Sequence, residues 1–284
     1  MSRLFAYMGN DPDRVACALY SARRLLVADA AETSPPVTFD SWGIGFYQGE
    51  VLLQRRPKAP AEPVDFYALA KELRTDVVIG HVRAGTVGKP KHENTHPFRF
   101  RSWLFAHHGT IPNFERVQKQ LLDAVPDFLR RNIRGQTDSE HLFHLLLAHL
   151  HEAGKLDDPN VSPFIVREAL RATLLQLESW IGAETARAAE CAVAVTNGRI
   201  LVATRHGKPV QLLRLESVSD CPVCREATPA PGRPYKRVDH EHLRAVTLVA
   251  DAPKPNGGPW QEVPDDSFVA VAHDLSVQIT PIHD

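Results

Sequence analysis

Short apolar runs, rich in β-branched and aromatic residues, recur near both ends of the chain and are bounded by Gly, Asn or Pro. Runs of this length and composition are typical of β-strands. They predict strands at residues 4–9, 43–48, 51–55, 77–84, 103–108, 191–196, 200–205, 210–215, 246–251, 267–272 and 277–282. Gln48-Gly49-Glu50 and Asn197-Gly198 lie between consecutive runs as tight-turn sequences, so we expect many strand pairs to be antiparallel.

The middle of the chain follows a helical period instead. From Asp138 to Ala153 apolar side chains cover one broad helical face, and Thr137 with Glu140 forms a capping box. The pattern recurs at 163–181, and shorter helices are expected at 12–27, 66–74 and 114–125. Along the chain, strands come first, then helices, then strands again. This order favours an α/β (α+β) layered fold, with two mainly antiparallel sheets packed face to face and helices outside.

The chain is long and apolar enough to bury a sizeable core, with 284 residues of which 43% are hydrophobic. Segments 28–41 and 217–242 are rich in Pro and in small and polar residues, which is typical of loops. Neither is typical of a linker between independent domains. We therefore predict a single domain over residues 1–284, with 217–242 as an irregular loop insertion.

Charge and composition exclude several classes of partner. Lys and Arg (33) nearly cancel Asp and Glu (34), so no net field attracts nucleic acid or an anionic membrane surface. The first residues lack the apolar region of a signal peptide, and no apolar run approaches the roughly 20 residues of a membrane span. We expect a cytoplasmic protein, and its four cysteines are too few and too uneven for a disulfide framework.

Ser2 is the first candidate for chemistry. If Met1 were removed, Ser2 would carry a hydroxyl nucleophile beside an α-amine whose reference pKa of about 7.7–8.0 suits it as a base. A retained Met1 would remove that free amine. Ser is also common after an initiator Met, so Ser2 alone is weak evidence of catalysis.

A second group of candidates lies between residues 80 and 111, where predicted strands end in Arg83 and in His107-His108-Gly109. Strand ends that open into Gly-rich loops leave backbone N–H groups free for a substrate oxygen, and the Arg83 fork suits a carboxylate. The alternatives are a surface ion pair for Arg83 and structural hydrogen bonds for the histidines.

Six segments in order resemble one known family, the class II glutamine amidotransferases of the N-terminal nucleophile hydrolase superfamily. The chain is most similar to the stand-alone glutaminase-like subgroup that includes the ergothioneine-biosynthesis hydrolase. The segments are MSRL (1–4), SWGIGFY (41–47), HVRAGT (81–86), NTHPF (94–98), LFAHHG (104–109) and TDSE (137–140). The late segments 197–205 and 249–264 also resemble that subgroup.

The resemblance implies a four-layer αββα sandwich and hydrolysis of the glutamine side-chain amide to glutamate and ammonia. By position it makes residue 2 the nucleophile and its α-amine the base, and it implies that Arg83 holds the substrate α-carboxylate and Asp138 the α-ammonium. It assigns Gly109 and residue 108 to the oxyanion hole, with Thr86 and His96 beside the substrate. No cofactor is required. The expected partners are an amino-acid or γ-glutamyl substrate and, because no synthase domain is fused, a separate ammonia-accepting enzyme or water.

Two positions depart from the family pattern: Ser2 stands where the family has Cys, and His108 where it has Asn. Both belong to the bond-breaking step. A hydroxyl depends wholly on base assistance, and His is bulkier than Asn and aims its donor differently. The paired changes allow three histories: a Ser-type amidase for another substrate, a binding site that has lost catalysis, or an engineered Ser2 made to trap a complex. His108 argues against the third, because a trapping change would alter only the nucleophile, unless His108 is native variation that coexists with Cys at residue 2.

A weaker pattern is Cys221-Pro-Val-Cys224 with His240 and His242 downstream. Two thiolates and two imidazoles can form a tetrahedral zinc site that would stabilise the 217–242 loop. One CxxC with two nearby histidines also occurs without metal. A zinc-stabilised interaction module therefore remains a third hypothesis.

Overall fold

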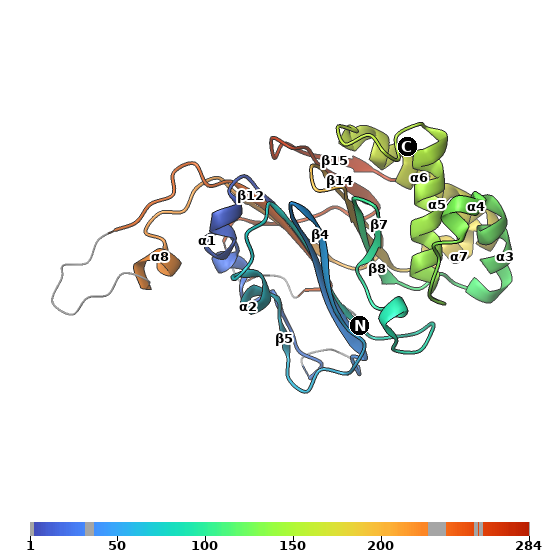
Figure 1. Ribbon diagram of the computed structural model, residues 1–284, viewed down its shortest axis with the longest axis horizontal. Coiled ribbons are helices and arrows are strands. Elements are labelled where there is room, and N and C mark those ends of the chain that lie inside the picture. The colour runs from blue at the N-terminus through green and yellow to red at the C-terminus, as the bar shows by residue number, and fades with distance from the viewer. Residues whose placement is uncertain (1–2, 32–36, 227–236, 253–254, 256–257, 284) are drawn as a thin grey trace.

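The computed structural model describes residues 3–31, 37–226, 237–252, 255 and 258–283 (Figure 1). Within these ranges two large sheets lie face to face and helices cover their outer faces. Figure 1 shows α1, α2 and α8 on one side of the sheets and α3 to α7 on the other. The described chain therefore forms the αββα sandwich that the sequence predicted.

The first large sheet has seven strands and the second has six, and every ladder among the described residues is antiparallel. The order in the first sheet is β13 (Trp260–Glu262), β11 (Val210–Leu215), β12 (Ala245–Ala250), β1 (Arg3–Gly9), β6 (Val77–Arg83), β3 (Ser41–Gln48) and β4 (Glu50–Arg56). The order in the second is β15 (Val277–Pro281), β14 (Ser267–Val271), β10 (Leu201–Arg205), β9 (Cys191–Thr196), β8 (Trp103–Gly109) and β7 (Phe98–Phe100). A small separate sheet pairs β2 (Val27–Ala28) with β5 (Val64–Asp65).

The helices come mainly from the middle of the chain, as the periodicity predicted. One layer contains α1 (Val15–Leu19), α2 (Phe66–Ala70) and α8 (Pro222–Glu226). The other contains α3 (Phe114–Ala124), α4 (Asp127–Arg130), α5 (Asp138–Glu152), α6 (Pro163–Ile181) and α7 (Ala183–Ala188). Short 3₁₀ segments are η1 (Pro12–Arg14), η2 (Tyr20–Ala22) and η3 (His92–Asn94). In the described residues no helix is both long and apolar enough to cross a membrane.

Period-two alternation along the strands explains the layers. In β8, Leu104 and Ala106 lie in the core between the sheets, whereas Trp103 and Phe105 pack under the helices. Burial of these apolar side chains drives the packing of the sheets and helices, since each side chain removes apolar area from water. Trp103 is fully buried and its indole N–H donates to the carbonyl oxygen of Leu156 at 2.8 Å, so it leaves no unpaired polar atom.

Three local predictions need correction. Residues 12–27 do not form one helix, because α1 ends at Leu19 and the chain tightens into a 3₁₀ turn at Tyr20–Ala22. The predicted helix at 66–74 ends at Ala70, where a tighter turn places the N–H of Leu73 on the carbonyl of Ala70. Segment 217–242 is less irregular than expected, because its described part holds α8 and an antiparallel bridge between Val218 and His240.

The N-terminus of α5 has a different cap from the predicted reciprocal box. The Thr137 hydroxyl accepts from the backbone N–H of Glu140 at 3.2 Å, as expected. The Glu140 carboxylate does not close the box. It accepts from the backbone N–H groups of Arg134 (2.9 Å) and Gly135 (2.6 Å), so it holds the loop that leads into the helix.

Candidate active site

The ends of β6 and β8 and the start of α5 meet around two adjoining cavities. A small cavity of about 20 Å³ is lined by His81, Arg83, Ala84, Thr86, Val87, His96, His107, Gly109, Thr137, Asp138 and Ser139. A wider one of about 520 Å³ is lined by Val37, Thr38, Ala84, Gly85, Thr86, His108, Gly109, Thr110, Glu190 and Lys208. Ala84, Thr86 and Gly109 line both, so the two cavities form one candidate site.

The structure brings together six of the residues singled out from the sequence. Arg83, His96 and Asp138 line the small cavity, His108 lines the wide one, and Thr86 and Gly109 connect them. Ser2 lies outside the described residues. The strand that follows it, β1, begins at Arg3, whose partner across the sheet is Val82, one residue before Arg83.

Arg83 is buried and already holds several acceptors. Its Nη1 is 2.8 Å from Oδ2 of Asp40, and its Nη2 donates to the carbonyl oxygens of Val87 and, at 2.8 Å, Gly88. These contacts fix the plane of the guanidinium at the cavity wall. The ion pair also shows that Arg83 is not the surface arginine that was one reading of the sequence.

Asp138 is the first residue of α5 and is almost fully buried. Its Oδ2 accepts from the N–H of Ile111 at 2.8 Å and its Oδ1 from the N–H of Ser139 at 2.9 Å. A helix N-terminus favours a negative charge, and these two donors orient the carboxylate. Asp138 therefore joins the loop after β8 to the start of α5 at the cavity.

Alternation in β8 sends two adjacent histidines to opposite faces of the sheet. The Nδ1 of His107 lies 3.0 Å from the hydroxyl oxygen of Ser139 on α5. His108 faces the other way, and its Nε2 lies 3.8 Å from Oδ2 of Asp251, beyond hydrogen-bond distance. Burial is the main cause that lowers the pKa of His108 to about 3, so its imidazole is neutral at physiological pH and carries a single N–H.

His81 and His96 stack at the back of the small cavity, with ring centroids 4.2 Å apart. Burial, reinforced by neighbouring histidines and Arg83, lowers the pKa of both well below the usual range. Neither ring nitrogen of either residue has a hydrogen-bond partner in the described part of the chain. Because these imidazoles are neutral, Arg83 supplies the positive charge of this cavity.

Gly109 has a φ of 157°, and a Cβ added to it would lie 2.6 Å from the carbonyl oxygen of Glu190 and 2.7 Å from Nε2 of His107. A side chain does not fit at this position. The Thr86 hydroxyl lies 2.8 Å from that of Thr110, which follows Gly109. The loops after β6 and β8 are thereby joined where the two cavities meet.

Sequence reasoning missed four residues of this site. Asp40 pairs with Arg83, Asp251 faces His108, and Lys208 forms a 2.9 Å ion pair with Glu190 at the rim of the wide cavity. Two signals were available: Asp40 directly precedes the 41–47 segment, and Asp251 lies within the 249–264 segment. The other three lie next to late strands: Glu190 directly precedes β9, Lys208 lies between β10 and β11, and Asp251 follows β12, so their approach to the site depends on sheet order.

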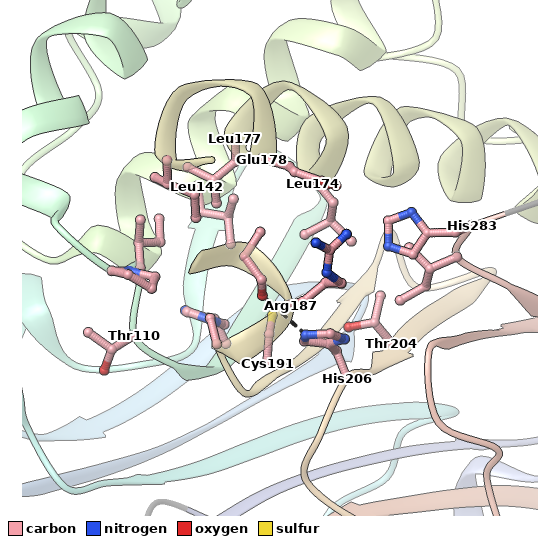
Figure 2. A pocket seen from close by; sticks show the side chains of 17 residues that line it. Thr110, Leu142, Leu174, Leu177, Glu178, Arg187, Cys191, Thr204, His206 and His283 are labelled. Atoms are coloured by element: carbon pink, nitrogen blue, oxygen red, sulfur yellow. Dashed lines mark hydrogen bonds between the residues drawn. The ribbon is translucent and has the colours of Figure 1, made fainter. Parts of the chain in front are cut away.

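A third cavity, of about 80 Å³, lies on the helix side of the second sheet (Figure 2). Figure 2 shows Leu142, Leu174 and Leu177 above it and Cys191, Thr204 and His206 below. It is lined largely by apolar side chains. It touches the candidate site at His107 and Thr110 but contains neither Arg83 nor His108, so it is not the cavity in which we place the chemistry.

The cysteine and histidine residues of the predicted zinc pattern lie in a different place, at α1 and α8. Cys221, Cys224 and His240 are grouped there, and Cys17, which the sequence pattern did not include, joins them. His242 does not belong to the group; its carbonyl oxygen instead accepts from the side-chain amide of Asn10 at 2.8 Å.

With this geometry established, the chain can be compared with known proteins. The family model for class II glutamine amidotransferases matches residues 1–273. The chain belongs to this family. Class II glutamine amidotransferases are enzymes of the N-terminal nucleophile type, which agrees with the αββα fold and the resemblance of the six segments.

Individual relatives of this amidotransferase chain include the probable glutamine amidotransferase DUG3 of Saccharomyces cerevisiae, 27% identical over 95% of this chain and 82% of the yeast protein. The γ-glutamyl-hercynylcysteine sulfoxide hydrolase of Mycobacterium tuberculosis is 36% identical over 74 residues, 25% of this chain and 32% of that protein. Among solved structures, a glutamine aminotransferase class-II domain protein from Silicibacter pomeroyi has a TM-score of 0.55 at 20% identity, covering 99% of this chain and all of that one. This structural likeness shows the shared fold.

Proposed function

We propose that this amidotransferase chain hydrolyses the side-chain amide of glutamine or of a γ-glutamyl compound through an acyl-enzyme at Ser2. The observation that carries the proposal is the shared lining of the two cavities by Thr86 and Gly109. It connects Arg83 and Asp138, which suit an amino-acid end, with His108, to which we assign the amide end. The names of the yeast and mycobacterial relatives support glutamine and γ-glutamyl substrates respectively.

The amino-acid end of the substrate needs one fixed cation and one fixed anion. Arg83 offers a buried guanidinium for the α-carboxylate, and Asp138 offers a buried carboxylate for the α-ammonium. Because the small cavity holds about 20 Å³, room for about one water, it must widen when this end binds. The Asp40 pairing of Arg83 is the contact that a substrate carboxylate would share or displace.

The bond-breaking steps use only side chains and water. The Ser2 hydroxyl oxygen attacks the amide carbon as its proton passes to the α-amine, which then donates a proton to the departing nitrogen. The C–N bond breaks, and ammonia leaves from glutamine or the free amine leaves from another γ-glutamyl compound; a water then hydrolyses the ester to release the carboxylate product and regenerate Ser2. The backbone N–H of Gly109 and the single N–H of neutral His108 stabilise the oxyanion of each tetrahedral intermediate. The chemistry requires no cofactor, and the ammonia passes to water or to a separate acceptor enzyme.

Intact-mass measurement of the purified protein, with and without a reactive glutamine analogue, tests the proposal. We expect a chain that lacks Met1 and gains the mass of one acyl group at Ser2. The matched control is Ser2→Ala, which keeps the free α-amine and should gain no mass. A processed chain that gains no mass, and that releases neither ammonia from glutamine nor glutamate from any other γ-glutamyl compound, would overturn the proposal.

A second candidate function is binding of glutamine or a related amino acid without turnover. It is favoured by the fact that both departures from the family pattern, Ser2 and His108, belong to the bond-breaking step, whereas Arg83 and Asp138 are retained. Calorimetric titration with glutamine separates the two functions: binding that is lost in Asp138→Asn, with no ammonia released by the parent chain, supports the binding protein.

A further inference from the structure

A second cluster of reactive side chains lies in the helical layer on the outer face of the first sheet, away from the cavities of the candidate active site. One ligand atom from each of four residues comes within 4.8 Å of the other three: Cys17, Cys221, Cys224 and His240. Cys17 comes from α1, Cys224 from α8 and His240 from the bridge with Val218. Figure 1 shows α1 and α8 on the side of the sheets opposite α5.

The distances within this cluster are close to those of ligands around one metal ion. The Sγ atoms of Cys17 and Cys224 are 3.6 Å apart, and the Cys224 Sγ is 3.2 Å from Nε2 of His240. A tetrahedral zinc ion with Zn–S bonds of about 2.3 Å requires ligand atoms about 3.8 Å apart. Shifts of a few tenths of an ångström in these side chains would therefore admit the ion.

The backbone around the cluster is held by its own hydrogen bonds. The N–H of Cys221 donates to Val238 at 2.7 Å, and Val218 and His240 exchange two hydrogen bonds of 3.1 and 2.8 Å. Cys221 is fully buried and Cys17 nearly so. The ligand positions are therefore set by the fold and not by long exposed side chains.

The donor set favours zinc. We propose that Cys17, Cys221, Cys224 and His240 bind one zinc ion in a structural Cys₃His site that joins α1 to the 217–242 segment. Three thiolates and an imidazole suit zinc and disfavour magnesium or calcium, which prefer oxygen ligands. Four protein ligands fill a tetrahedral shell and leave no position for a substrate, so the role is structural. The Arg14 guanidinium, whose Nη1 is 3.5 Å from Cys224 Sγ, offsets the excess negative charge of three thiolates.

This site differs from the zinc pattern that the sequence indicated. Cys17 replaces His242 as the fourth ligand, because α1 packs beside α8 whereas His242 is exposed and outside the cluster. The site does not depend on the proposed amidohydrolase function. Loss of zinc and loss of amide hydrolysis are therefore separable results.

Metal analysis of the full-length chain, purified under reducing conditions from cells supplied with zinc, tests the proposal. We expect about one zinc per chain in the parent protein and less than about a tenth of that in Cys17→Ala and His240→Ala. His242→Ala is the matched control and should keep the parent zinc content. Thiol titration after denaturation should count four free cysteines, because zinc binding leaves no disulfide.

Cobalt substitution keeps the test decisive if a cysteine variant does not fold. The parent chain, reconstituted with Co²⁺ alone, should show the visible absorption of tetrahedral cobalt with thiolate charge-transfer bands, and added Zn²⁺ should abolish it. Folded protein with no bound zinc and no cobalt spectrum would overturn the proposal. So would a disulfide between Cys17 and Cys224, bound iron in place of zinc, or equal zinc loss in His242→Ala and His240→Ala.

Discussion

Arg83 and Asp40 form an ion pair at the end of β6, with 2.8 Å between Nη1 and Oδ2 and only 6% of the Arg83 side chain exposed. Gly85 makes this contact possible. A Cβ at that position would lie 2.1 Å from the same Asp40 oxygen and 2.8 Å from Cζ of Arg83. The pair thus depends on a backbone position that only glycine fits, and it fixes the cation to which we assign the substrate carboxylate.

Replacement of Asp40 by Ala should weaken both folding and substrate binding. The free energy of unfolding should fall by about 1–3 kcal/mol, because a buried guanidinium loses its counter-charge. The KM for a γ-glutamyl substrate should rise about tenfold with a smaller change in kcat, since Arg83 loses one anchor. Urea denaturation and steady-state ammonia release measure the two effects.

The control is Asp123→Ala, which removes the carboxylate of an exposed i,i+4 pair with Lys119. Such pairs contribute less than about 1 kcal/mol, so its stability and KM should match the parent. Equal effects of the two substitutions would contradict the positioning role of Asp40.

Replacing Ser2 and His108 by the Cys and Asn that the family resemblance implies at these positions tests what limits the site. We expect the double variant Ser2→Cys, His108→Asn to gain glutaminase activity of about 10²-fold or more over the parent, because a thiol is partly ionised near neutral pH and one oxyanion donor is worth about 10²–10³ in rate. Ammonia release from glutamine measures it. Ser2→Ala, His108→Asn is the control, and a double variant no faster than this control would show that the defect lies elsewhere.

Acid should unfold the protein through its buried histidines. Burial lowers the pKa of His81, His96, His107 and His108 below the unfolded value of about 6.5, so below that pH the unfolded state binds more protons than the folded state. Their stabilising contribution is complete above pH 6.5 and declines as pH falls, for His108 until about pH 3. Each such histidine adds a slope of about 1.4 kcal/mol per pH unit.

Burial is the main cause that raises the pKa of Asp251, so this carboxyl has the opposite effect on stability. As the pH falls through its titration range it stabilises the folded state, and it offsets part of the stability lost through the histidines. His108→Asn should reduce the slope of unfolding free energy between pH 6 and pH 4.5 by about 1.4 kcal/mol per unit. Denaturant titrations at a series of pH values measure this. Parallel curves for parent and variant would show that His108 is not held neutral by the fold.

The cap of α5 predicts an order of stability among three variants. Thr137→Ala should cost about 1 kcal/mol, the usual cost of a lost N-cap. Glu140→Ala removes the acceptor of two backbone N–H groups, those of Arg134 and Gly135, and should cost about 1–3 kcal/mol. Glu140→Gln keeps one acceptor oxygen and should fall between Glu140→Ala and the parent. Chemical denaturation measures all three, and a larger loss in Thr137→Ala than in Glu140→Ala would contradict this account.

Local patterns in the sequence were sufficient to predict most strands of the two large sheets and the two long helices. The helix over 163–181 has the bounds of α6, and the runs at 191–196 and 210–215 have those of β9 and β11. In these elements apolar side chains repeat every two residues in a strand or every 3.6 residues in a helix, and this repeat can be read from a short stretch of sequence. Short elements such as β7 and α8 have too few residues to show a period, and the break after Leu19 depends on packing.

The residues of the candidate site also fall into two groups, those that sequence motifs indicated and those that only the structure revealed. The ordered motifs were sufficient to single out Arg83, Thr86, His96, His108, Gly109 and Asp138, because each lies inside a segment that resembles a motif of the family. Asp40, Asp251 and Cys17 could not be found in this way. Their partners are Arg83, His108 and the Cys221-Cys224 pair, which lie far from them along the chain.

The sequence by itself therefore determined most of the elements and the family, and it led to the proposal that Ser2 is the nucleophile, since these depend on local patterns and their order. Only the tertiary structure decided which charges face one another. It paired Asp40 with Arg83, placed Asp251 before His108 and brought Cys17 in place of His242 beside Cys221, Cys224 and His240. The physical reason is that these contacts are set by strand order and by the packing of α1 against α8, which no local period encodes.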